Sequence, residues 1–144
     1  MNGFELKTYH SGLLQARAYR ALRYYMADFL KKYHLSMMEW TLLGHISESN
    51  KEGINISQLA ELFGVETSLM TNSINKLHDK GLVGRTSDVS DKRIRLVRIT
   101  KKGGLLVKKV EKKLSASLEE WLKDINPKAI VHYMEVLKYL ANKN

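Results

Sequence analysis

The chain of 144 residues contains no cysteine, a single proline and no long apolar segment. Without cysteine, the isolated chain can form no disulfide, no thiol redox sensor and no cysteine-ligated zinc site. No apolar run approaches the roughly 20 residues that a membrane-spanning helix needs. The first ten residues also lack the basic-then-apolar order of a signal peptide. We therefore expect a cytoplasmic protein that has no membrane partner.

Motifs that would indicate catalysis or metal binding are also missing. Lys102-Gly103-Gly104 lacks the flanking pattern of a phosphate-binding loop. No nucleophile motif accompanies the serines. The five histidines form no ligand pair at the spacing that a metal site needs. We expect neither an enzyme nor a resident metal or other cofactor.

Positive charge is what the chain has in excess. The formal net charge is +9, and residues 85–113 alone carry eleven Lys or Arg against three Asp or Glu. Residues 36–84 carry three basic against six acidic side chains. A localised basic patch is typical of a protein that binds a polyanion such as DNA. The alternative is a lysine-rich surface that is merely solvated.

Residues 55–100 have the pattern of two short helices followed by two short strands. In the first helix, Leu59, Leu62 and Phe63 recur at helical spacing and predict its apolar face. Asn55 precedes this helix and is a suitable N-cap. Gly64 can take the positive φ that ends a helix sharply. The pattern indicates a helix-turn-helix.

The second helix is predicted over about Thr67–Lys80, with Thr67 as its N-cap. Met70, Ile74 and Leu77 mark its buried side. The other side carries short hydrogen-bonding side chains, which can approach base edges in a major groove. The alternative is an exposed helix face without a partner. The candidate DNA contacts on this helix are Thr67, Ser68, Thr71, Asn72, Asn75 and Lys76, with Lys76 expected on phosphate.

Leu82–Arg85 and Ile94–Ile99 are predicted to be two strands of a hairpin. In the second strand, Ile94, Leu96 and Ile99 are expected to form the apolar side, with Val97 beside Leu96. A basic hairpin beside a recognition helix can contact phosphate or enter a minor groove. Arg85 is either such a contact or only a brace of the hairpin. The candidate DNA contacts in the hairpin are Arg85, Lys92, Arg93 and Arg95.

Long helical patterns flank this region. One covers residues 8–33, one begins at Ser36 with the S-x-x-E spacing of a capping box, and one covers about residues 101–123. A last helix begins at Pro127. The helix over residues 8–33 is apolar on more than one side and needs more than one partner surface. We expect a homodimer on a pseudo-palindromic site, with recognition helices about 34 Å apart. The alternative is that this helix packs wholly inside one chain.

In their order and spacing, these motifs resemble the MarR family of bacterial and archaeal transcription regulators. The matching residues are Leu59-Ala60, Gly64-Val65, Leu77, Lys80-Gly81-Leu82-Val83, Asp91-Lys92-Arg93, Ile99-Thr100 and Lys102-Gly103. The resemblance implies a mainly α fold with a small β-hairpin wing. It implies a winged helix-turn-helix lobe at residues 36–100, between dimerisation helices at residues 1–35 and 101–144. It also implies that Asp91 holds the shape of the wing and that Arg93 is its DNA contact.

The recognition helix departs from the family pattern. Asn72 stands where an arginine is often found, and Leu69 stands where a small or polar residue is common. No target sequence can therefore be carried over. Family members commonly bind aromatic effectors between the dimer helices and the DNA-binding lobe, although such side chains can be simple core. The candidate effector contacts here are Tyr9, Tyr19, Tyr25, Met37 and Trp40.

These observations predict a sequence-specific regulator that binds double-stranded DNA. We expect a repressor that a small aromatic effector relieves. The alternative is a winged-helix protein-interaction or architectural module without a specific operator. A protein-interaction module predicts no salt-dependent binding to DNA.

Overall fold

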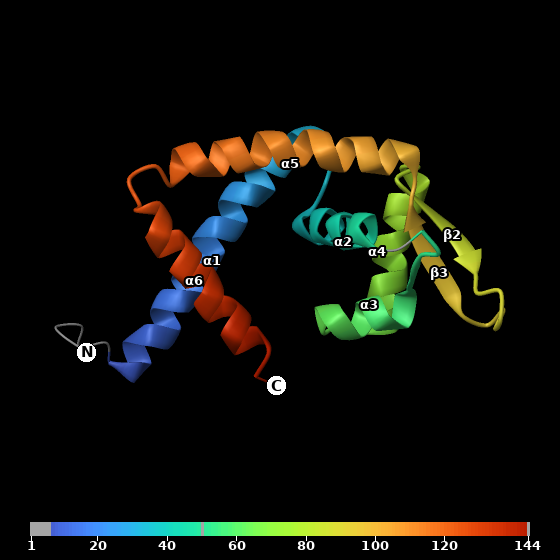
Figure 1. Cartoon of the computed structure of the whole chain (residues 1–144), viewed down its shortest axis with the longest axis horizontal. Helices are drawn as coiled ribbons and strands as arrows, with labels where there is room; N and C mark the ends of the chain where they lie inside the picture. The colour runs from blue at the N-terminus through green and yellow to red at the C-terminus, as the bar shows by residue number, and fades with distance from the viewer. Residues whose placement is uncertain (1–6, 50, 144) are drawn as a thin grey trace. The chain divides into compact units, whose positions relative to one another are not determined.

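The computed structural model describes residues 7–49 and 51–143. The elements, drawn in Figure 1, are α1 (Thr8–Leu30), a 3-10 turn (Lys31–Tyr33), α2 (Met37–Glu48), β1 (Ile54–Asn55), α3 (Ile56–Phe63), α4 (Thr67–Asp79), β2 (Val83–Ser87), β3 (Arg95–Ile99), α5 (Lys101–Trp121) and α6 (Pro127–Ala141). They form two compact units, Met1–Val110 and Glu111–Asn144. The predicted fold class, mainly α with a small β wing, is confirmed.

Side-chain caps define the helix ends that the sequence predicted. At the start of α2, the Ser36 hydroxyl accepts the Glu39 backbone N–H at 3.1 Å, and the Glu39 carboxylate accepts the Ser36 N–H at 2.7 Å. This reciprocal pair is the predicted capping box. At the start of α6, the Asn126 side chain accepts the Lys128 N–H at 2.9 Å, and Pro127 occupies the first turn.

The helix-turn-helix consists of α3 and α4. Asn55 caps α3 as predicted, because its side-chain oxygen accepts the Ser57 N–H at 2.8 Å. Gly64 ends α3 in the left-handed conformation, with φ of 63°. The prediction that Thr67 caps α4 is wrong. Glu66 holds the extended N-cap backbone, with φ of −67° and ψ of 148°, so Thr67 is already helical.

The wing is a three-stranded antiparallel sheet in the order β1-β3-β2. The sequence predicted only the hairpin of β2 and β3, because a two-residue strand such as β1 has no alternation to detect. The predicted apolar residues of β3 are buried to different degrees. Val97 is fully buried, whereas Leu96 is half-buried, and Val97 pairs with Ile54 of β1 and Arg85 of β2. Because β3 pairs with a strand on each edge, its orientation is fixed, and Val97 faces the core.

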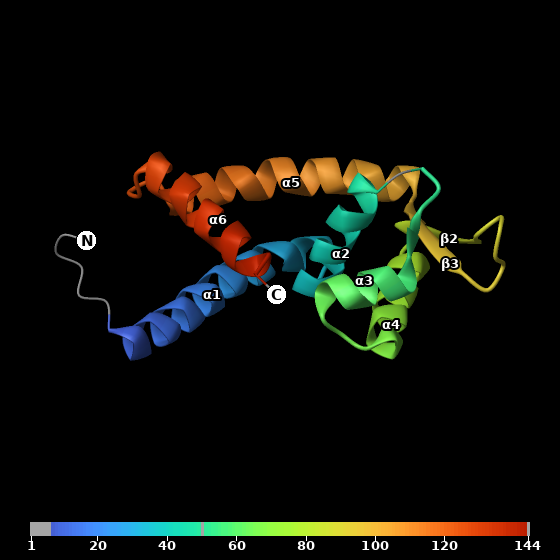
Figure 2. The same ribbon diagram turned by 60° about the horizontal axis from the view of Figure 1, so that its bottom comes forward.

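The core of the N-terminal unit lies among α2, α3, α4 and the sheet, which Figure 2 shows side by side. The predicted apolar face of α3 needs one correction, since Leu62 is 61% exposed and Ile56, Leu59 and Ala60 are the buried residues. The fully buried side chains contributed by these elements are Leu42, Leu43, Ile46, Leu59, Met70, Ile74, Leu77, Val83 and Val97.

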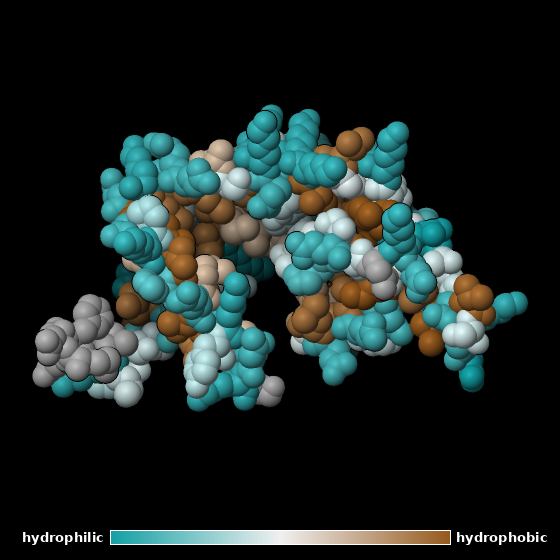
Figure 3. Space-filling model, in the orientation of Figure 1, coloured by the Kyte–Doolittle hydropathy of each residue, from teal (hydrophilic) through white to brown (hydrophobic). Residues whose placement is uncertain are grey.

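Large apolar side chains are exposed on the terminal helices. On α1 they are Tyr9, Leu13, Leu14, Tyr19, Leu22 and Tyr24. On α6, where Figure 3 shows apolar side chains at the surface, they are Val131, Tyr133, Met134, Val136, Tyr139 and Leu140. Within residues 7–49 and 51–143, every helix is too short or too polar to cross a lipid bilayer.

Candidate nucleic-acid interface

One side of α4 is open to solvent. Its buried side is formed by Met70, Ser73, Ile74 and Leu77. On the other side, Thr67, Ser68, Leu69, Asn72 and Lys76 are exposed, and Thr71 and Asn75 are half-buried. The Thr71 hydroxyl donates to the Thr67 carbonyl at 2.8 Å, so its proton is used inside the helix and only its oxygen remains as an acceptor. The predicted polar residues therefore share one accessible face.

A cavity of about 230 Å³ lies where the starts of α3 and α4 meet the start of β3 in the wing. Three segments that are distant in the sequence line it. The residues are Asn55, Ile56, Ser57, Thr67, Thr71, Arg93, Ile94 and Arg95. Arginine residues and the N-terminus of a helix both favour an anion. The cavity therefore suits a phosphate oxygen.

This cavity brings together four of the predicted contacts, Thr67, Thr71, Arg93 and Arg95. It also contains Asn55 and Ser57, which the sequence analysis did not count as functional. The only signal at these two positions was the N-cap pattern of α3. A cap side chain already points at the open end of its helix, so this signal could have placed Asn55 near an anion site.

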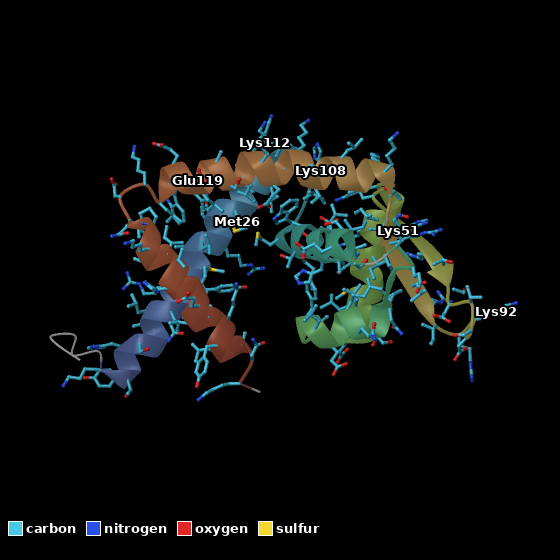
Figure 4. All side chains as sticks on the ribbon, in the orientation of Figure 1. Met26, Lys51, Lys92, Lys108, Lys112 and Glu119 are labelled. Atoms are coloured by element: carbon cyan, nitrogen blue, oxygen red, sulfur yellow. The ribbon has the colours of Figure 1, made fainter. Side chains whose placement is uncertain are left out.

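The loop between β2 and β3 is organised by two aspartates. The Asp88 carboxylate accepts from the Ser90 hydroxyl at 2.5 Å, the Ser90 N–H at 2.8 Å and the Asp91 N–H at 3.1 Å. These bonds, the Ser90 hydroxyl first, hold the pKa of Asp88 below its ordinary value. The Asp91 carboxylate accepts from Arg93 at its backbone N–H, at 3.0 Å, and at Nε, at 3.3 Å. Figure 4 shows Lys92 extending from the end of this loop.

Arg85 connects the wing to α4. Its guanidinium, on β2, donates to the side-chain oxygen of Asn75. The sequence predicts Arg85 as a DNA contact or as a brace of the hairpin, and it predicts Asn75 as a base contact. In the structure the two side chains hold each other, so the Asn75 oxygen is already engaged.

The other end of α4 is fixed by Lys80. Its ammonium donates to Glu39 at 2.7 Å and to the His34 carbonyl at 2.6 Å. Glu39 is only 6% exposed. Burial by itself raises the pKa of Glu39, but the bonds from Lys80 and Ser36 outweigh it and hold the pKa below its ordinary value. The recognition helix is thereby anchored to the start of α2.

A second cavity, an open groove of about 550 Å³, lies between α1 and the start of α2. Its lining residues are Arg20, Arg23, Tyr24, Ala27, Lys31, Leu35, Ser36 and Met37. Met37 is the member of the predicted effector set that lines it. Of the others, Tyr9 and Tyr19 are exposed on α1, Tyr25 is half-buried and Trp40 is buried.

Within residues 7–49 and 51–143, no three His, Asp or Glu side chains are placed to hold a metal ion. Sites that the structure does form include the basic cavity at the wing, the open face of α4 and the groove beside α1. None of these contains a cluster of carboxylates or imidazoles.

Known proteins share this fold over nearly the whole chain. BldR from Sulfolobus solfataricus is 27% identical, with a TM-score of 0.76, covering 93% of this chain and 99% of its own. CouR from Rhodococcus jostii RHA1, solved with p-coumaroyl-CoA, is 22% identical, with a TM-score of 0.79 and 92% of each chain covered. A MarR mutant from E. coli, solved with operator DNA, is 20% identical, with a TM-score of 0.76, covering 90% of this chain and 91% of its own.

The sequence itself also matches a known family. Residues 34–94, which run from just before α2 into the wing, match the sequence model of the MarR family. This segment contains the helix-turn-helix, the Lys80 anchor and the loop with Asp91 and Arg93. The fold, its wing and this match agree, and over these residues the chain is similar to the MarR family.

Proposed function

We propose that this protein is a homodimeric transcription regulator that binds a specific, pseudo-palindromic site in double-stranded DNA. The observation that carries the proposal is the cavity in which Arg93 and Arg95 meet the starts of α3 and α4. It lies beside the open face of α4, so one surface combines phosphate contacts with side chains that suit base edges. A MarR protein of the same fold has been solved with operator DNA.

In this proposal, α4 enters the major groove and the wing lies along the adjacent backbone or minor groove. The N-terminal residues of a recognition helix contact base edges in such complexes. Arg93 and Arg95 bind phosphate at the cavity, and Lys76 and Lys92 add further phosphate contacts. These contacts supply most of the affinity, which therefore falls steeply as the salt concentration rises.

The terminal helices form the dimer. Each carries large apolar side chains that a single chain leaves in water, and a second copy would cover them. We accordingly assign residues 1–35 and 101–144 to dimerisation and residues 36–100 to DNA binding. Two-fold symmetry places two copies of α4 on successive turns of the DNA, about 34 Å apart.

The regulator acts as a repressor that a small-molecule effector releases. The groove beside α1 and α2 has room for a ligand, and CouR of the same fold binds p-coumaroyl-CoA. An effector can act only if it binds one arrangement of the lobes better than another. Of the predicted contacts Tyr9, Tyr19, Tyr25, Met37 and Trp40, it is Met37 that lines this groove. A regulator must be in the same compartment as the chromosomal DNA that it binds, so we also propose a cytoplasmic location.

Fluorescence-anisotropy titration tests this function directly. The purified dimer is titrated against DNA from upstream of its own gene and against scrambled DNA of equal length, at several salt concentrations. We expect tighter binding to the first DNA and affinity that falls with salt. The double variant Arg93→Ala/Arg95→Ala should lose binding to both DNAs. The charge-matched control Lys128→Ala/Lys138→Ala, in α6, should keep it.

Absence of binding even at low salt would refute the proposal. The winged-helix interaction module without an operator would then describe the protein better. Equal, salt-dependent binding to both DNAs would instead favour the architectural module.

A further inference from the structure

Leu69 is the apolar exception on the open face of α4. Its side chain is 50% exposed, although it lies in the first turn of a helix whose accessible side chains are otherwise polar. Met70, Ile74 and Leu77 fill the core from the buried side of α4. Leu69 lies at the edge of that side, about 100° around the helix from Met70. The exposed half of Leu69 is therefore apolar surface that a partner could cover.

Helical geometry divides the open face of α4 into two strips. Successive residues turn by about 100°, so Thr67, Thr71 and Asn75 follow one strip. This strip faces the wing, because Thr67 and Thr71 line the cavity with Arg93, and Asn75 is bonded to Arg85.

The second strip contains Leu69, Asn72 and Lys76, spaced i, i+3 and i+7. All three are exposed. It lies on the side of the open face away from the wing strip, so the wing leaves it accessible. A recognition helix reads bases mainly from its N-terminal residues, and Leu69 is the third residue of α4.

The chemistry of the strip indicates what it can read. An asparagine side chain can pair with the N6 and N7 atoms of adenine, and a lysine can meet phosphate or guanine. Leucine neither donates nor accepts a hydrogen bond. The apolar feature that the bases of a major groove present is the 5-methyl group of thymine.

We propose that Leu69 determines specificity by contacting the 5-methyl group of one thymine in each half-site. This inference rests on the proposed DNA-binding function and adds to it a residue and a base. Burial of the half-exposed leucine against the methyl group stabilises the complex only where that methyl group is present. The half-site should therefore contain a thymine next to the base that Asn72 contacts.

Deleting the methyl group from the DNA tests this contact without changing any hydrogen bond. The preferred site of the wild-type dimer is first selected from random DNA. Each thymine of that site is then replaced in turn by deoxyuridine, in both half-sites together. At one position, uracil should weaken wild-type binding about fourfold per half-site, the value of one buried methyl group.

Three variants separate the contact from a change in folding. Leu69→Ala should bind the thymine and uracil forms of that position equally, because alanine does not reach the methyl group. Leu69→Met should retain part of the discrimination. Leu62→Ala removes a similarly exposed leucine from α3, which is 61% exposed, and should discriminate as the wild type does. Circular dichroism should show the same helix content in all three.

Each other result has a definite meaning. If Leu69→Ala loses affinity at the same uracil position as the wild type, or if no position responds to uracil, the inference is wrong and the DNA-binding function still stands. If the wild-type dimer selects no sequence at all, the proposed function fails and the role of Leu69 fails with it.

Discussion

The Lys80 ammonium, just beyond α4, lies 2.7 Å from the buried Glu39 carboxylate in the first turn of α2. The same ammonium donates to the carbonyl of His34, whose backbone is left-handed with φ of 55°. Non-glycine residues rarely adopt this conformation, and the surrounding contacts must hold them there. Lys80 therefore fixes the end of the recognition helix to the junction between α1 and α2.

Glu39→Gln should lower the free energy of unfolding by about 2 kcal/mol. Glutamine can keep the bond to the Ser36 N–H, but it removes the negative charge that binds Lys80. Denaturant unfolding followed by circular dichroism measures the loss. Glu48→Gln, an exposed position at the other end of α2, is the control and should change stability by less than about 0.5 kcal/mol. Equal stability of both variants would show that the Lys80–Glu39 pair contributes nothing.

The contribution of Glu39 should disappear in acid. Because its pKa is lower in the folded than in the unfolded chain, its stabilising effect is fully present above the unfolded value, about 4.3. The effect is lost as the pH falls through the folded value. The difference in unfolding free energy between wild type and Glu39→Gln should therefore be constant near neutral pH and shrink below about pH 4. A difference that grows in acid would contradict the lowered pKa.

Two adjacent glycines of α5 should respond oppositely to alanine. A Cβ on Gly103 would lie 2.1 Å from the Leu82 carbonyl oxygen, so α5 would have to move, and we expect a loss of about 1–3 kcal/mol. A Cβ on Gly104 meets nothing within 4 Å. Alanine there should stabilise the helix by about 0.5–1 kcal/mol. Thermal unfolding of both variants tests the contrast, and similar melting temperatures would argue against the close approach of α5 to Leu82.

Arg93→Ala and Asn72→Ala should weaken DNA binding in different ways. Loss of the phosphate contact by Arg93 should reduce affinity for all DNA and lower the salt slope by about one unit. Loss of Asn72 should cost roughly 1–3 kcal/mol on the cognate site only, with the slope unchanged. Anisotropy titrations at four or more salt concentrations measure both quantities. An unchanged slope for Arg93→Ala would remove it from the phosphate contacts.

Arg85 and Asn75 should act as one unit in DNA binding. If the bond between them positions the wing, the effects of Arg85→Ala and Asn75→Ala on affinity should not add in the double variant. The coupling free energy should be about 0.5–3 kcal/mol. Arg98→Ala, on β3, provides a second cycle with Asn75 that should be additive. Additive losses in the Arg85 cycle would mean that both side chains contact DNA independently.

The parts of the fold that depend on neighbours in the sequence were predictable. The capping box at Ser36, the Asn55 cap and the turn at Gly64 each follow from residue types within a few positions. The open face of α4 follows in the same way from helical spacing. Such patterns state which residues are accessible, but they do not state which other segment lies beside them.

Contacts between distant segments were not predictable. The β1 strand, the burial of Val97 and the bond between Arg85 and Asn75 all depend on how strands and helices pack in three dimensions. The cavity at the wing has the same origin, because its lining comes from three separate segments. Asn55 and Ser57 were missed for this reason.

Asn55 belongs to two elements at once, since it pairs with Leu96 as part of β1 and caps α3 with its side chain. Two residues before it, Gly53 has φ of 103°, and a Cβ there would lie 2.8 Å from the Val97 carbonyl oxygen. An insertion or deletion of one residue here would shift the register of β1 and turn the Asn55 side chain to the opposite face of the sheet. This short join therefore has a fixed length, and it couples the wing to the helix-turn-helix.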